Sequence, residues 1–168
     1  MKKILVIGDS SRDVFVYCDA LRLCPDVPVP VLNIKDQTEN PGMAKNVHRN
    51  IKSLHDECSI LTNTNWYDIT KTRYVHHNSN HTFFRVDTTQ KIPRINLNHI
   101  EYDKYDLIVV SDYDKGFLTE DDIMRYVSNI LILLLILKRF LGHGYNMQSI
   151  LRLMIMNIKT QNHILFLK

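Results

Sequence analysis

Short continuous apolar runs recur through the first 110 residues of the chain. Lys3–Ile7, Cys58–Leu61 and Leu107–Val110 each contain three or four such positions and end at polar residues or turn residues. Runs of this length, apolar on both faces, are typical of parallel strands covered on both sides. They predict the central sheet of an α/β domain.

Two further patterns complete the predicted elements of this region. Met43–Leu54 repeats apolar residues at helical spacing and predicts a helix. The β-branched segments Val14–Tyr17 and Val27–Ile34 predict strands, and the prolines of the second favour a small flanking sheet. Thr70–His77 and Thr82–Asp87 flank a turn cluster and predict a hairpin.

The pattern changes near residue 128. Thr119 and Asp122 form a Thr-x-x-Asp helix start, with the helix running to about Val127. Ile100–Tyr105 fits neither the helical nor the strand period clearly. Beyond Ser128 the chain has no acidic residue and few turn-forming residues. We therefore divide the chain into residues 1–128, an α/β unit, and residues 129–168, an apolar and basic tail for which helix or poor order is the default expectation.

Charge follows the same division. All 18 acidic residues lie at or before Asp122, so residues 1–122 carry −3 and the remainder +6. The basic total comes from the tail and not from a face of the folded part, which argues against nucleic-acid binding. Three unpaired cysteines and the lack of a signal-peptide core predict a cytoplasmic protein.

Polar residues follow several predicted strands and turns. Asp9, Asp13, Asn46 and Asp112 occupy such positions, which converge on one edge of a parallel sheet. Carboxylates and an amide at one rim suit the hydroxyl groups of a sugar. Gly42 allows a tight turn into the helix, and the cations that could meet a phosphate are Lys71, Arg73, Arg85 and Lys115.

Each of these residues also has an ordinary explanation. An Asp after a strand is often a cap or turn residue, Arg85 and Asp87 could belong to a solvated strand face, and Asn46 could simply face solvent. His76 and His77 point to opposite faces of a strand, so we predict no metal site.

Taken together, the residues resemble the ribokinase-like (PfkB-type) carbohydrate kinases over about residues 3–127. Within that family the likeness is greatest to the heptose-7-phosphate kinase branch. The matching stretches are Val6-Ile7-Gly8-Asp9 with Asp13, Cys24-Pro25-Asp26-Val27-Pro28-Val29-Pro30-Val31, Asn40-Pro41-Gly42-Met43-Ala44-Lys45-Asn46-Val47, Thr70-Lys71-Thr72-Arg73, Phe84-Arg85-Val86-Asp87 and Ser111-Asp112-Tyr113-Asp114-Lys115-Gly116.

The resemblance implies part of a three-layer α/β sandwich with a small β lid over a sugar or sugar phosphate. It implies ATP and Mg²⁺ as cofactors and leaves open a homodimer formed through the lid. Asp13, Gly42 and Asn46 would hold sugar hydroxyls, and Asp112 and Lys115 would close the site. The lid would carry Lys71, Arg73, Arg85 and Asp87. The family usually has a second glycine where this chain has Met43.

The family's second half carries an Asn-x-x-Glu motif near Mg²⁺ and a Gly-Ala-Gly-Asp motif whose Asp is the catalytic base. No residue after Asp122 is acidic, so neither motif occurs in the tail and no catalytic residue is assigned. We expect a truncated carbohydrate kinase without turnover of its own. The alternative is a non-catalytic sugar-phosphate-binding or dimerisation module.

The tail has three explanations. The first is a frameshift: because Met has the single codon ATG, reading from its third base turns Met154-Ile155 into Asp and Met156-Asn157 into Glu. With A/T-rich codons that frame reads N-D-Y-E, an Asn-x-x-Glu motif. A native pair of apolar helices ranks second, and a membrane-surface anchor around Ile130–Leu137 ranks third.

Overall fold

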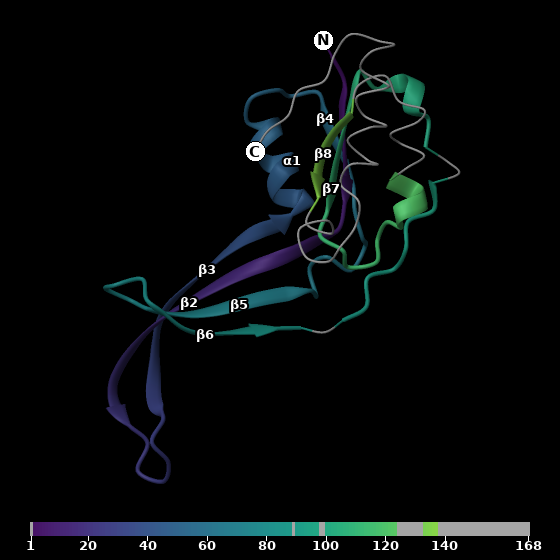
Figure 1. Cartoon of the computed structure of the whole chain (residues 1–168). Helices are drawn as coiled ribbons and strands as arrows, with labels where there is room; N and C mark the ends of the chain where they lie inside the picture. The colour runs from purple at the N-terminus through teal and green to yellow at the C-terminus, as the bar shows by residue number, and fades with distance from the viewer. Residues whose placement is uncertain (1, 89, 98–99, 124–132, 138–168) are drawn as a thin grey trace.

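The computed structural model describes residues 2–88, 90–97, 100–123 and 133–137. They form two four-stranded sheets, a core sheet and a second sheet that projects from one end of it (Figure 1). The rest of the residues from 129 to 168, for which helix or poor order was expected, lie outside the described residues.

The core sheet is parallel throughout, in the order β4-β1-β7-β8. Its strands are β4 (Cys58–Leu61), β1 (Ile4–Gly8), β7 (Leu107–Asp112) and β8 (Leu133–Leu137). The apolar runs predicted as buried strands therefore form adjacent strands, β4, β1 and β7. Their pairing confirms the predicted α/β fold class.

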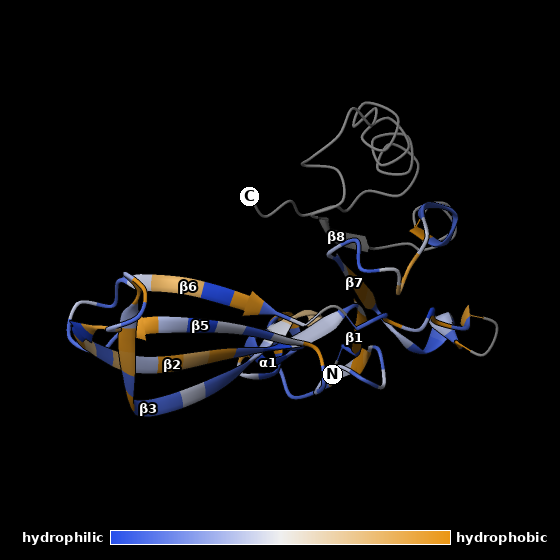
Figure 2. Cartoon of the chain, turned by 90° about the horizontal axis from the view of Figure 1, so that it is seen from below, coloured by the Kyte–Doolittle hydropathy of each residue, from blue (hydrophilic) through white to orange (hydrophobic). Residues whose placement is uncertain are grey.

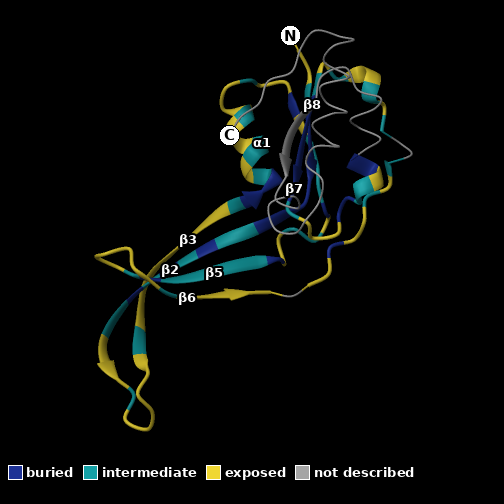
Figure 3. Ribbon diagram, viewed as in Figure 1, coloured by how far each residue is buried: buried dark blue, intermediate teal, exposed yellow. Residues whose placement is uncertain are grey.

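The adjacent strands β1 and β7 are buried along almost their whole length (Figure 3). On one face, α1 (Ala44–Lys52) packs Ala44, Val47 and Ile51 against Val6 and Val109. On the other face, segments from residues 92–97, 100–105 and 117–123 pack in a larger apolar cluster. Its buried members are Leu5, Ile7, Ile69, Ile92, Ile108, Val110, Phe117, Leu118 and Ile123. Successive residues of β1 and β7 thus pack alternately against α1 and against the apolar cluster on the other face, because successive side chains of a strand point to opposite faces of the sheet.

The second sheet, which we call the lid, has the order β3-β2-β5-β6. It consists of β2 (Ser10–Leu23), β3 (Pro30–Met43), β5 (Thr70–His76) and β6 (Thr82–Asp87). A single residue, Asp9, separates β1 from β2, and β3 leads directly into α1. The lid is therefore joined to the core at the carboxyl ends of the core strands (Figure 1).

The two faces of the lid differ in character. Val14, Val16 and Cys18 are buried on one face with Leu32, Tyr74 and Phe83. Between them on β2 lie the aromatic residues Phe15 and Tyr17, with Asp13 and Asp19 on either side, whereas β3 is hydrophilic over much of its length (Figure 2). The opposite face of β2 therefore mixes aromatic and charged side chains.

The structure corrects three details of the expected elements. Leu133–Leu137 forms β8, paired in parallel with β7, where helix was the default for the tail. A short, fully apolar run fits a buried strand as well as a helix, so its periodicity does not decide between them. The flanking strands β2 and β3 are much longer than the β-branched segments, and within 100–105 only η2 (Tyr102–Lys104) is regular.

The expected helix start at Thr119 is present. Thr119 N–H donates to the carboxylate of Asp122 at 2.8 Å, and Asp122 N–H donates to the Thr119 hydroxyl at 3.2 Å. This reciprocal pair is a capping box. Arg94 also contacts Asp122 at 3.0 Å and ties the preceding segment to the same point.

Candidate functional site

The lid meets the core at Gly42, which lies against the side chain of Asp13. A Cβ atom added to Gly42 would lie 2.7 Å from the Ser11 hydroxyl oxygen and 2.9 Å from a carboxylate oxygen of Asp13. Only glycine fits there without displacement of these groups. Asp13 also pairs with Arg73 of β5 at 3.3 Å, with both side chains a little under one third exposed.

Met43, the next residue, has a backbone conformation that side-chain-bearing residues rarely adopt. Its φ is 56° and its ψ is −130°, and its side chain is 5% exposed. Such a conformation suits glycine, because a Cβ atom makes it costly. The conformation explains, in physical terms, why the resemblance puts a second glycine at this position.

Asp9 and Asp112, at the carboxyl ends of β1 and β7, are both fully buried. The Asp9 carboxylate accepts hydrogen bonds from Tyr113 N–H at 2.8 Å and Lys115 N–H at 2.9 Å. Asp112 accepts one from Asp114 N–H at 3.3 Å. Burial, followed by the nearby charge of Asp112, raises the pKa of Asp9 to about 6 against the lowering effect of its hydrogen bonds. The contacts of Asp9 are therefore those of a carboxylate that caps a turn, which was the ordinary explanation offered for an Asp after a strand.

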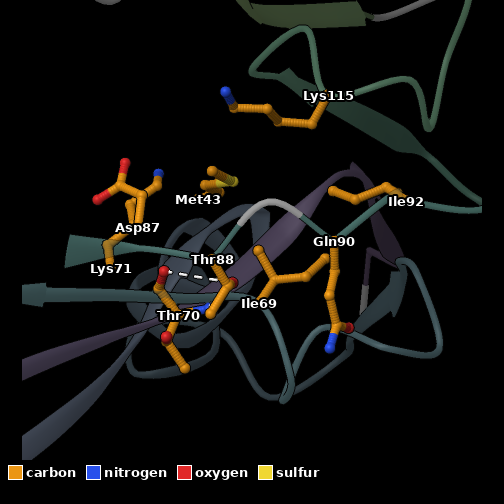
Figure 4. Close-up of a pocket in the computed structure, with 9 residues that line it drawn as sticks. All are labelled: Met43, Ile69, Thr70, Lys71, Asp87, Thr88, Gln90, Ile92 and Lys115. Carbon is orange, nitrogen blue, oxygen red and sulfur yellow. Dashed lines mark hydrogen bonds between the residues drawn. The ribbon is translucent and has the colours of Figure 1, made fainter.

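A pocket of about 300 Å³ lies between the lid and the loop after β7 (Figure 4). Lys115 reaches over it from that loop, and Lys71 and Asp87 lie on its lid side. Thr70 N–H donates to the Thr88 hydroxyl at 2.8 Å and fixes the two strand ends beneath. The complete lining is Met43, Ile69, Thr70, Lys71, Asp87, Thr88, Gln90, Ile92 and Lys115.

The predicted site residues fall into groups. Lys71, Asp87 and Lys115 line the pocket together. Arg85 joins them indirectly, because its guanidinium contacts both oxygens of Asp87, at 2.7 and 3.0 Å. Asn46 is exposed in the first turn of α1 and is not part of the pocket lining.

The remaining predicted residues surround the junction. Asp13, Gly42 and Arg73 form one contact group at the base of the lid, and Asp112 lies buried beneath the loop that carries Lys115. Their roles in binding a sugar stay predictions. The structure does bring the lid, the turn into α1 and the loop after β7 to one end of the core sheet (Figure 1).

Sequence reasoning missed six of the pocket residues. Met43, Ile69, Thr70, Thr88, Gln90 and Ile92 line it without having been singled out. Thr70 and Thr88 adjoin Lys71 and Asp87, and the hairpin register pairs those two residues. That register was the available signal, whereas the Ile69 and Ile92 contacts depend on tertiary packing.

The described residues hold no cluster suited to a divalent metal. None of their His, Cys, Asp and Glu side chains gather in a group of three or more. The pocket has two lysines and one carboxylate, which is already paired with Arg85. This composition fits an anion, such as a phosphate, better than Mg²⁺. Also within the described part, no helix has the length and apolar character needed to cross a bilayer.

Comparison with known proteins gives relatives of one kind. The chain is 33% identical to the bifunctional protein HldE of Helicobacter pylori strain G27, an alignment that covers 70% of this chain and 33% of that protein. It is 30% identical to HldE of Helicobacter hepaticus, over 71% and 32%. The chain thus spans about a third of the length of the curated relatives it matches. No family model matches it.

Among solved structures the chain is similar to sugar kinases. Ribokinase from Thermotoga maritima aligns with a TM-score of 0.44 and 10% identity, covering 92% of this chain and 69% of that one. Phosphofructokinase-2 from Escherichia coli, solved with fructose-6-phosphate, gives 0.40 and 12%, covering 99% and 55%.

A parallel α/β core with a β lid joined at its carboxyl edge is the ribokinase-like fold, which this chain shares. Its homologues are the HldE proteins, and the homology lies in the N-terminal 70% of the chain. The resemblance stated from the sequence is confirmed.

Proposed function

We propose that residues 3–127 are the sugar-binding part of a ribokinase-like kinase and bind a phosphorylated heptose or a similar sugar phosphate. The observation that carries the proposal is the pocket between lid and core, lined by two lysines from different elements, Lys71 and Lys115. Two ammonium groups around one small cavity attract a dianionic phosphate. The hydroxyl and amide groups beside them suit the sugar.

Each side chain has a definite task in this proposal. Lys71 and Lys115 hold the phosphate, with Thr70 and Thr88 hydroxyls beside it. Asp13, oriented by Arg73, accepts a hydrogen bond from a sugar hydroxyl, and Gly42, which has no Cβ, lets the Asp13 carboxylate lie directly against the backbone. Asn46 and Arg85 lie at the edge of this arrangement, and Asp112 supports the loop from below.

We further propose that the 168 residues do not transfer phosphate by themselves. The family uses ATP, and phosphoryl transfer needs stabilisation of the developing charge and a base that orients the hydroxyl. No acidic residue follows Asp122, and the described residues do not fit a Mg²⁺ site. No catalytic step is therefore assigned to this chain.

Binding and turnover are tested with the same protein. Calorimetry with sedoheptulose 7-phosphate should give measurable binding at pH 7.5, and incubation with ATP and Mg²⁺ should give no ADP. K71M and K115M should each weaken binding about tenfold, the loss expected for one hydrogen bond to a charged group. K52M, at the exposed end of α1, is the matched control and should bind as the wild type does.

Two outcomes would contradict this proposal. A wild-type chain that shows no binding of sugar phosphates would remove the sugar-binding role. ADP formation that depends on the sugar would show that the chain is a complete kinase.

We propose that a frameshift precedes residues 129–168, so that this part of the gene codes for kinase sequence in a different reading frame. The forced Asp and Glu of the shifted frame and the lack of acidic residues in the frame as read support this explanation. Fresh sequencing of the gene around and beyond codon 128 tests it. If no shifted frame continues to a Gly-Ala-Gly-Asp motif, the idea is wrong.

A second candidate function is a module that forms a homodimer through the lid. The far part of the β2–β3 hairpin exposes large apolar side chains, with Leu21 81%, Leu23 62% and Ile34 64% exposed. Such a patch favours contact with another protein surface. Light scattering after size-exclusion chromatography should give a dimer for the wild type and a monomer for the L21D/I34D variant, and a monomeric wild type would remove this candidate.

The membrane-anchor explanation of the tail is tested separately. Pelleting with anionic lipid vesicles should leave the protein in the supernatant. Sedimentation with the vesicles would favour an anchor over a shifted reading frame.

A further inference from the structure

Asp9 connects three segments that form the candidate site. It lies between β1 and β2, at the point where the lid leaves the core. Its backbone carbonyl accepts the N–H of Ala44, the first residue of α1, at 3.0 Å. Its carboxylate accepts the N–H groups of Tyr113 and Lys115, more than 100 residues further along the chain.

The carboxylate uses its two oxygens separately. Oδ1 accepts from Tyr113 and Oδ2 accepts from Lys115. An asparagine could not replace it in this arrangement, because one of its two terminal atoms is an NH₂ donor that would face an N–H. The arrangement therefore needs a carboxylate, although burying a charge beside Asp112 opposes folding.

We propose that Asp9 is a positioning residue, whose ionised carboxylate holds the loop of Tyr113 to Lys115 so that the Lys115 side chain lies over the pocket. The inference rests on the proposed function, since it assigns Lys115 to the phosphate. Asp9 itself is fully buried and is not part of the pocket lining, so it acts through the loop.

The surroundings of Asp9 make its ionisation measurable. The titratable side chains that act on Asp9 are those of Asp112 and Tyr113, and Tyr113 is also close to the charge of Asp13 on β2. Lys115 contributes its backbone N–H, and α1 contributes the N–H of Ala44. Burial raises the pKa of Asp9 to about 6, so the carboxylate is charged at pH 7.5 and largely protonated at pH 5. A protonated carboxyl group is a poorer acceptor for two N–H groups.

The first measurement needs no ligand. In ¹H–¹⁵N spectra of the full chain, the amide signals of Tyr113 and Lys115 should shift together with pH, with a midpoint near 6. The same signals should not titrate in D9N. Amide signals that stay constant between pH 5 and 7.5 in the wild type would overturn the proposal.

The second measurement is the binding of sedoheptulose 7-phosphate in a double-mutant cycle of Asp9 and Lys115. D9N should weaken binding about tenfold at pH 7.5 without lowering the melting temperature, while D56N, an exposed carboxylate before β4, should change neither. In the K115M background, D9N should have little further effect, because a residue that acts through Lys115 has nothing left to position.

The outcomes separate the two proposals. Wild-type binding that D9N leaves unchanged overturns the positioning role and leaves the proposed function standing. So does a D9N variant that loses melting temperature and affinity together, or one whose effect is equally large in the K115M background. A wild-type chain that does not bind the probe removes the proposed function, and the positioning role falls with it.

Discussion

Replacing Met43 by glycine and by alanine should reverse the usual order of stability of these two residues. At φ 56° and ψ −130°, a residue with a Cβ atom carries a strain of roughly 1 to 3 kcal/mol, which glycine does not. Met43 is 5% exposed, so either replacement loses the burial of its side chain, worth about 1.5 to 3 kcal/mol. Only M43G recovers the strain.

The difference between the two variants isolates the backbone term. M43A keeps the strain and should be destabilised by about 2 to 5 kcal/mol, the range for large-to-alanine changes in a core. Glycine costs about 0.5 to 1 kcal/mol relative to alanine through the freedom of the unfolded chain. M43G should therefore be more stable than M43A by about 1 kcal/mol.

Urea unfolding followed by circular dichroism measures this difference. The control pair is V47A and V47G in α1, where the backbone is helical and the glycine variant should be the less stable by about 1 kcal/mol. If M43A proves as stable as M43G or more so, residue 43 does not have the glycine-type conformation and the account of the turn into α1 is wrong.

Three further variants test the junction and the cap. Because the pKa of Asp9 is raised from 3.8 to about 6, the native state binds its proton more tightly, and the wild type should lose about 3 kcal/mol of stability as pH rises from 3 to 7; urea unfolding of D9N should lack this slope. G42A should lower the urea midpoint by displacing the Ser11 hydroxyl, and S11A should partly restore it, since that buried oxygen makes no hydrogen bond in the described structure. T119A should cost about 1 kcal/mol through loss of the cap to Asp122, measured by thermal unfolding.

The core sheet could be predicted because each of its strands within residues 1–128 is a local apolar run. The predicted Cys58–Leu61 has the observed bounds of β4, and β1 and β7 differ from their predictions by a residue or two at an end. The parallel pairing of β1 with both neighbours follows from burial on two faces. α1 was equally local, because the residues that pack against the core, Ala44, Val47 and Ile51, recur at helical spacing.

The lid was harder because much of it is polar. β3 continues through a run of exposed polar residues from Lys35 to Asn40, which lack the alternation that marks a strand. Its pairing with β2 along the whole length sets its conformation, and that pairing is a tertiary contact. The apolar run of β8 posed the opposite problem, since both helix and strand fit it.

The candidate site also has features that the local sequence indicates and features that depend on tertiary contacts. The residue types could be chosen from the sequence because they follow strands and turns, but the contacts of Asp9 with Tyr113 and Lys115 join positions more than 100 residues apart. The conformation of Met43 was hidden for another reason: the local sequence gives a methionine where the backbone requires glycine-like freedom.

The positive charges of the site differ in a way that bears on what it selects. Arg73 and Arg85 are each fixed by a carboxylate, Asp13 and Asp87, so part of their donor capacity is already used within the lid. The two lysines lie on opposite sides of the pocket, one on the lid and one on the loop that Asp9 contacts. A group bound between them bridges lid and core, which a neutral sugar held by the lid alone would not do. If the proposed function holds, selection of a phosphorylated sugar and fixation of the lid would be one event, because the phosphate would contribute the contacts on both sides.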